Sequence, residues 1–72
     1  MEEININTEF IKLDSLLKFS ALVATGGEAK NVIADGLVTV NDEVCTACGK
    51  KIRAGDTVVF AGQKIRVIHE DQ

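Results

Sequence analysis

The sequence predicts a small α+β domain in which a two-helix motif packs on a small, mostly antiparallel β-sheet, with an additional N-terminal strand. Two observations lead to this prediction. Apolar residues recur at helical spacing between residues 11 and 35, whereas residues 37–68 show the β-branched, alternating pattern of short strands. Because the chain has only 72 residues, we expect residues 1–72 to form a single domain.

A strand and a helix are expected first. Ile4 and Ile6 alternate with polar residues, which is typical of a half-buried strand, so we expect a strand over residues 3–7. Leucines that lie three and four positions apart share one face of a helix. Leucines with this spacing between positions 13 and 17 predict a first helix over residues 13–19.

The stretch TGGEAK, residues 25–30, marks the start of a second helix. Thr25 and Glu28 have the spacing of a capping box, in which each side chain accepts a hydrogen bond from the other residue's backbone amide. Gly36 suits the left-handed residue beyond a helix end, so we expect this helix over residues 26–35. TGGEAK lacks the longer Gly-Lys-Ser/Thr loop of a nucleotide phosphate site.

Short strands and turns account for the rest of the chain. In the last of these strands, apolar residues alternate with Lys64 and Arg66, which predicts one buried face and one basic face. We expect turns at residues 41–42, 54–56 and 61–63 and a polar loop over residues 46–51. The expected strands are residues 37–40, 43–45, 57–60 and 64–68.

Composition excludes several functional classes. The net charge is −3, but four acidic residues lie at the two ends, so the interior is close to neutral and can carry a basic face. The chain has only three aromatic residues, which argues against binding of single strands by serial base stacking. No segment is long enough to span a membrane and no signal peptide opens the chain, so we expect a cytoplasmic protein.

The sequence predicts neither an enzyme nor a cofactor or metal site. It contains one histidine and no evident catalytic grouping of a nucleophile, a base and an acid. Cys45 and Cys48 have metal or redox spacing, yet a structural zinc needs four ligands and His69 is the only further candidate. We favour structural cysteines. A thiol role, or a zinc shared between two chains, is the lesser alternative.

The order of the motifs resembles a known family. The segment IKLDSLLKFSALVATGGEAKNVIADGLVTVNDEV, followed by KKIRAGD, resembles the RNA-binding domain named after ribosomal small-subunit protein four, the S4 domain. The ending FAGQKIRVI is similar to the small free-standing bacterial members, the YbcJ/YaaA-like group. The matching positions are Leu13-Asp14, Leu17, Thr25, Glu28-Ala29, Ile33, Gly36, Val38, Val40-Asn41 and Gly55-Asp56.

The resemblance implies a non-catalytic module that binds structured RNA, for example ribosomal RNA, with no role in DNA binding or at a membrane. Such binding would use phosphates and shape. The chain departs from the family pattern at Gly26, where many members carry arginine, and at Asp42 and Ala54. The alternative is a protein-interaction module that keeps the fold. The RNA-facing candidates carried over by position are Lys12, Lys18, Thr25, Gly26, Gly27, Lys30, Asn41, Lys50, Lys51 and Arg53.

Overall fold

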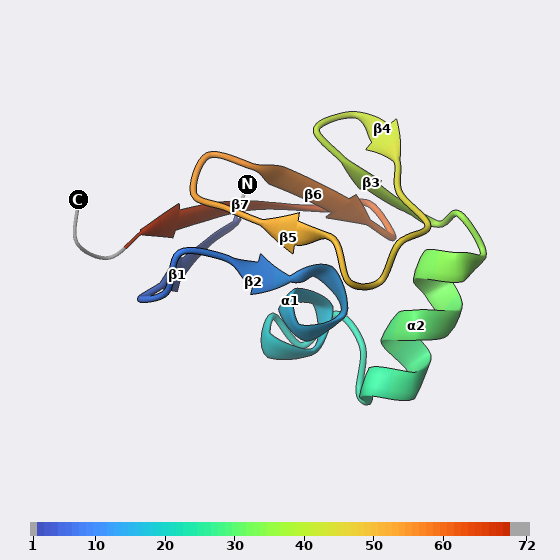
Figure 1. The fold of residues 1–72 in the computed structure, drawn as a ribbon. Coiled ribbons are helices and arrows are strands. Elements are labelled where there is room, and N and C mark those ends of the chain that lie inside the picture. Colours follow the sequence, from blue (N-terminus) through green and yellow to red (C-terminus); the bar gives the residue numbers. More distant parts are fainter. Residues whose placement is uncertain (1, 70–72) are drawn as a thin grey trace.

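The computed structural model describes residues 2–69 and confirms the predicted α+β fold (Figure 1). Two helices lie against one face of a sheet, and a short two-stranded ribbon lies beside the first helix. In chain order the elements are β1 (Glu2–Ile6), β2 (Ile11–Lys12), α1 (Leu13–Phe19), α2 (Gly26–Ala34), β3 (Val38–Val40), β4 (Glu43–Val44), β5 (Lys51–Ile52), β6 (Thr57–Phe60) and β7 (Gln63–His69).

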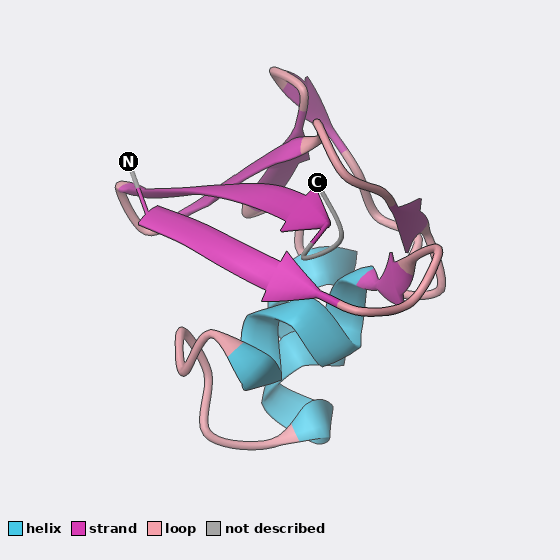
Figure 2. Ribbon diagram, turned by 90° about the vertical axis from the view of Figure 1, so that its left-hand side faces the viewer, coloured by secondary structure: helices cyan, strands magenta, loops and turns pink. Residues whose placement is uncertain are grey.

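The main sheet has five strands in the order β1-β7-β6-β3-β4. Its pairings are antiparallel except that of β1 with β7, which is parallel, and Figure 2 shows these two strands side by side and pointing the same way. The second sheet is the antiparallel ribbon of β2 and β5. The first strand of the chain therefore pairs with the last, and the segment after β1 pairs with the middle of the chain.

The first helix has the predicted bounds, whereas the second ends one residue earlier than expected, with Asp35 as its C-cap. The Thr25 side chain accepts a hydrogen bond from the Glu28 amide at 3.1 Å, as predicted. The prediction for the reciprocal hydrogen bond of the capping box, from the Thr25 amide to the Glu28 side chain, is wrong. The Glu28 carboxylate accepts from the amide of Ala24 at 2.9 Å, one residue beyond the cap, because the long side chain reaches past the extended Thr25.

The turns at residues 41–42 and 54–56 are where they were predicted, but Gln63, predicted in the last turn, is the first residue of β7. The predicted strands are wrong by one residue at several ends, since β1 covers residues 2–6, β3 covers 38–40, β4 covers 43–44 and β7 covers 63–69. Asn41 and Asp42 have φ values of 51° and 71°, the left-handed pair that gives a two-residue hairpin the twist of its strands. Gly36 has φ 77°, in agreement with its predicted place beyond α2. The predicted polar loop over residues 46–51 is one residue too long, because Lys51 pairs with Lys12 in the ribbon.

The core lies between the helices and the inner face of the sheet. Leu13, Leu16 and Leu17 are fully buried, so α1 places a leucine face against the sheet. The outer face of the sheet shows the predicted alternation in β7, where Lys64 and Arg66 are exposed between buried apolar residues. The buried apolar residues are Ile6, Leu13, Leu16, Leu17, Val23, Ala29, Ile33, Val38, Val40, Ile52, Val58, Ile65 and Val67.

Candidate nucleic-acid interface

The loop before β5 closes over the start of α1. The first amides of a helix have no acceptor within the helix, and Lys12, the N-cap of α1, makes no side-chain cap. The carbonyl groups of the loop take this role. The Leu13 amide donates to the Lys50 carbonyl at 2.9 Å, and the Asp14 amide donates to the Cys48 carbonyl at 3.2 Å. The backbone of the loop is therefore held against the helix, and two lysines are held with it.

Basic side chains gather on the outward face of the β2–β5 ribbon. Lys12 and Lys51 are direct partners in the register, so their Cβ atoms lie about 5 Å apart on one face. The Lys51 Nζ lies 5.0 Å from the centroid of the Phe10 ring, and the Arg53 guanidinium lies 6.0 Å from the same centroid. We call Phe10, Lys12, Lys51 and Arg53 the basic ribbon.

Lys12 and Lys51 repel each other across the basic ribbon. Like charges that lie directly opposite each other in a sheet destabilise it, and this applies to Lys12 and Lys51. The Phe10 ring offsets part of that repulsion, since a cation over an aromatic face is stabilised by about 0.5–1 kcal/mol at an exposed site. Exposed cations held together by backbone hydrogen bonds are suited to binding phosphate oxygens.

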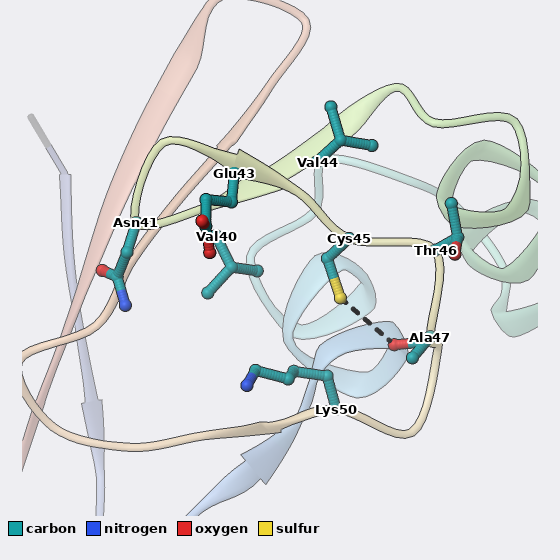
Figure 3. Close-up of a pocket in the computed structure, with 8 residues that line it drawn as sticks. All are labelled: Val40, Asn41, Glu43, Val44, Cys45, Thr46, Ala47 and Lys50. Carbon is teal, nitrogen blue, oxygen red and sulfur yellow. Dashed lines mark hydrogen bonds between the residues drawn. The ribbon is translucent and has the colours of Figure 1, made fainter.

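A surface hollow of about 330 Å³ lies beside the ribbon (Figure 3). Lys50 extends along one side of it, and Asn41 and Glu43 lie on the opposite side. The Cys45 thiol points inward and donates a weak hydrogen bond to the Ala47 carbonyl, with the sulfur 3.7 Å from the oxygen. The structure thus brings Asn41 and Lys50 to one hollow, although they are nine positions apart in the sequence.

Asn41 has a structural role at this hollow. Its Nδ2 donates to the Asp56 carboxylate at 3.1 Å, and its Oδ1 accepts from the Thr57 amide at 2.9 Å. The other carboxylate oxygen of Asp56 accepts from the Arg53 amide at 2.9 Å. These bonds tie the β3–β4 turn to the turn before β6, so Asn41 and Asp56 fix the backbone that carries Arg53.

The remaining candidates lie around the start of α2 and on α1. Thr25, Gly26, Gly27 and Lys30 form the first turns of α2, at the end of that helix farthest from the sheet. In both ribbon views α1 lies between this turn and the basic ribbon. Lys18 is exposed in the last turn of α1, at the opposite end from Lys12. Nine of the ten predicted residues thus form two separate groups, and Lys18 lies outside both.

The two cysteines belong to the packing of the loop. Both are free and half-buried, and both contact the apolar core. Within residues 2–69, no group of three or more histidine, cysteine or acidic side chains gathers in a way that could hold a metal ion. His69, the further ligand candidate, is half-buried at the end of β7.

Sequence reasoning missed Phe10 as part of this surface. Its signal was available: Phe10 and Lys12 have the two-residue spacing of one strand face, and Lys51 and Arg53 repeat it. Strands of two residues are too short to show a convincing alternation, so this signal became clear only when the pairing of β2 with β5 was known.

The fold and this surface define a small α+β domain with a two-helix motif and a basic ribbon beside its first helix. The family model of the S4 domain matches residues 4–68, and the chain belongs to the S4 domain family. Since the model covers most of the chain, the predicted resemblance is confirmed. The assignment of all of residues 1–72 to one domain stays a prediction.

Similar proteins and a solved structure extend this result. The chain is 39% identical over 59 residues to the probable ribosome maturation protein RlbA of Bacillus subtilis (strain 168). The aligned residues cover 82% of this chain and 83% of RlbA. The chain is 41% identical over 58 residues to YbcJ of Escherichia coli (strain K12), with 81% and 83% covered. The solution structure of E. coli YbcJ matches this fold with a TM-score of 0.73 at 36% identity, over 94% of this chain and 87% of the YbcJ chain.

Proposed function

We propose that this protein is a non-catalytic module that binds structured RNA, including ribosomal RNA, through backbone phosphates and shape. The observation that carries the proposal is the basic ribbon, in which Lys12, Lys51 and Arg53 share one face. The YbcJ structure was described as revealing an alpha-L motif involved in RNA binding, and RlbA is named for ribosome maturation. Both descriptions support RNA, rather than DNA, as the ligand of this chain.

Within this proposal the ribbon and the start of α2 contact separate phosphates of one folded RNA. The ribbon supplies compact positive charge. The start of α2 supplies backbone amides at the positive end of a helix, and Lys30 follows one turn later. The negative charge of Glu28 lowers the positive potential at this turn, because a hydrogen bond from the Ala24 amide holds its carboxylate there. The ribbon is therefore the stronger of the two contacts.

The proposed partner also leads to a proposal for where the protein is located in the cell. No helix among residues 2–69 has the length and apolar character needed to cross a bilayer. A module that binds ribosomal RNA works where ribosomes are assembled, so we propose the cytoplasm as its compartment.

The test of the proposed function is binding of the purified protein to a ribosomal RNA stem-loop at several salt concentrations. We expect the logarithm of the binding constant to fall linearly with the logarithm of salt concentration, by about 0.7–0.9 for each phosphate that is neutralised. If four phosphates are neutralised, the slope of this plot is therefore about −3. Absence of binding at low salt, together with recovery of a protein partner after nuclease treatment, would instead select the protein-interaction module.

Replacing Gly26 with arginine is expected to strengthen RNA binding. A Cβ built at Gly26 meets no atom within 4 Å, so a side chain fits there without rearrangement. The new cation adds one phosphate contact, which should steepen the salt dependence by about 1. Gly26→Ala is the matched control, since alanine lowers the backbone entropy of the unfolded chain as arginine does but adds no charge. Equal RNA affinity of the two variants would exclude the start of α2 from the RNA-binding surface.

A further inference from the structure

A second hollow, of about 390 Å³, lies between the end of β1 and the end of α1. Figure 2 shows the end of β1 passing over α1. The hollow is lined by Asn5, Ile6, Asn7, Thr8, Ile11 and Phe19. Its volume is within the range of small-molecule sites, which begins near 300 Å³. Neither the basic ribbon nor the start of α2 includes this hollow.

Phe19 is the aromatic residue that this hollow presents to solvent. Its side chain is 65% exposed, although burying a phenylalanine normally stabilises a fold by about 1.5–3 kcal/mol. Within residues 2–69, Phe19 is one of three large apolar side chains that remain so exposed, and the other two, Leu37 and Val44, lie outside this hollow. An exposed ring beside an apolar floor of Ile6 and Ile11 offers a flat surface for a planar ligand.

Polar side chains at the rim complement this aromatic surface. Asn5 and Asn7 each bring an amide, which carries two donors and one acceptor. The Thr8 hydroxyl donates to the Phe10 carbonyl at 2.8 Å, which fixes the turn after β1 and leaves the hydroxyl oxygen as an acceptor. A planar ring with donors and acceptors along its edge is the ligand that this combination fits.

Two lysines are next to lining residues of the hollow in the sequence. Lys18 precedes Phe19 in the last turn of α1, and Lys12 follows Ile11 in β2. Both lysines are exposed. Because β2 contributes Ile11 to the hollow and Lys12 to the basic ribbon, the two surfaces share one strand.

We infer that this hollow binds one unpaired nucleobase of the RNA that the basic ribbon holds. The inference rests on the proposed function and adds a means of recognition to it. Sequence-specific RNA recognition uses unstacked bases, which stack on aromatic side chains and form hydrogen bonds along their edges. Phe19 stacks on the base, and the amides of Asn5 and Asn7 contact its edge. A single ring cannot support a run of bases, so the scarcity of aromatic residues is compatible with this site.

The test compares RNA hairpins that differ by one nucleotide. One hairpin has a fully paired stem, and four others carry a single bulged A, C, G or U at the same place. We expect the protein to bind at least one bulged hairpin between about 5-fold and 100-fold more tightly than the paired one, the range of a base stacked on an aromatic residue. Phe19→Ala should remove this preference and leave binding to the paired hairpin unchanged.

Three further variants make the test specific. Phe19→Tyr keeps the ring and should keep the preference. Leu37→Ala removes a side chain of similar exposure, 56%, outside the hollow and should have no effect. Asn7→Ala should change which bulged base is preferred, a result that a purely structural role of Asn7 would not produce. The melting temperature of each variant verifies that it folds.

Three results would overturn the inference while the proposed function stands. The first is equal binding of the paired and bulged hairpins. The second is an equal loss of affinity for all hairpins in Phe19→Ala, and the third is self-association of the protein that Phe19→Ala abolishes, since either would assign the ring another role. If the unmodified protein binds no hairpin at low salt, the proposed function fails and the inference fails with it.

Discussion

Replacing Lys50 and Lys51 together with glutamate is expected to lower RNA affinity by about tenfold or more and to reduce the salt dependence by about 2. The physical reason is the loss of two phosphate contacts at the point where positive charge is most concentrated. Phosphate contacts position a protein without reading sequence, so the loss should be similar for different RNAs. Fluorescence anisotropy with two unrelated stem-loops at several salt concentrations measures both quantities.

The same variant should fold at least as well as the unmodified protein. A glutamate at position 51 lies directly opposite Lys12, so it replaces a repulsive cross-strand pair with an attractive one, which offsets the loss of the Lys51 contact with the Phe10 ring. Such pairs contribute about 0.2–1 kcal/mol. The backbone carbonyl of Lys50, which accepts from the Leu13 amide, is unaffected by the substitution. Urea denaturation should therefore show equal or higher stability, which would separate the loss of binding from a loss of structure.

The chain offers a matched control for this experiment. Lys64 and Arg66 are exposed on the outer face of β7, and their replacement with glutamate changes the net charge by the same amount. Because Arg66 lies opposite Glu3 in β1, urea denaturation must verify that this variant folds. We expect RNA affinity to fall much less in this variant than in the Lys50, Lys51 variant. Equal losses in both would mean that binding follows net charge alone, and the basic ribbon would then have no special role.

Leu16→Ala is expected to lower the free energy of unfolding by about 2–5 kcal/mol. Leu16 is fully buried in the leucine face of α1, and its truncation leaves a cavity that a close-packed core fills only in part. In a domain of this size a single hydrophobic core rarely supplies more than about 3–5 kcal/mol, so this single change removes a large fraction of the total stability. Chemical denaturation followed by circular dichroism gives the difference.

Ser15→Ala is the control for that measurement. Ser15 is the exposed neighbour of Leu16 in the same helix, so its change should shift stability by less than about 0.5 kcal/mol. RNA binding by Leu16→Ala should recover when the temperature is lowered enough to keep the variant folded. A loss below about 1 kcal/mol for Leu16→Ala would contradict the dense packing of α1 against the sheet.

Local signals in the sequence were sufficient for much of the fold. The leucine spacing set the bounds of α1, because a helix is stabilised by contacts between residues three and four positions apart. The Asn41-Asp42 pair set its hairpin turn, because both residues tolerate the left-handed conformation that the turn requires. Thr25 set the start of α2 by capping the Glu28 amide. Each of these features depends on residues within a few positions of one another.

The candidate site could be predicted only in part. The family resemblance placed Lys12, Lys50, Lys51 and Arg53 among the RNA-facing residues, and the structure brings these four to the ribbon and its adjoining hollow. Their contact with RNA stays a prediction. Phe10 was missed because its role depends on side chains that lie more than forty positions along the chain.

The fold class, the helix starts and the hairpin turns could be read from the residues alone, since these depend on local backbone and side-chain preferences. The parallel pairing of β1 with β7 and the pairing of β2 with β5 could not, and they became known from the folded chain. The exposure of Phe19 beside a hollow likewise became known from the folded chain. The physical reason is that these features arise from packing between segments distant in the chain, and no local preference of either segment specifies its partner.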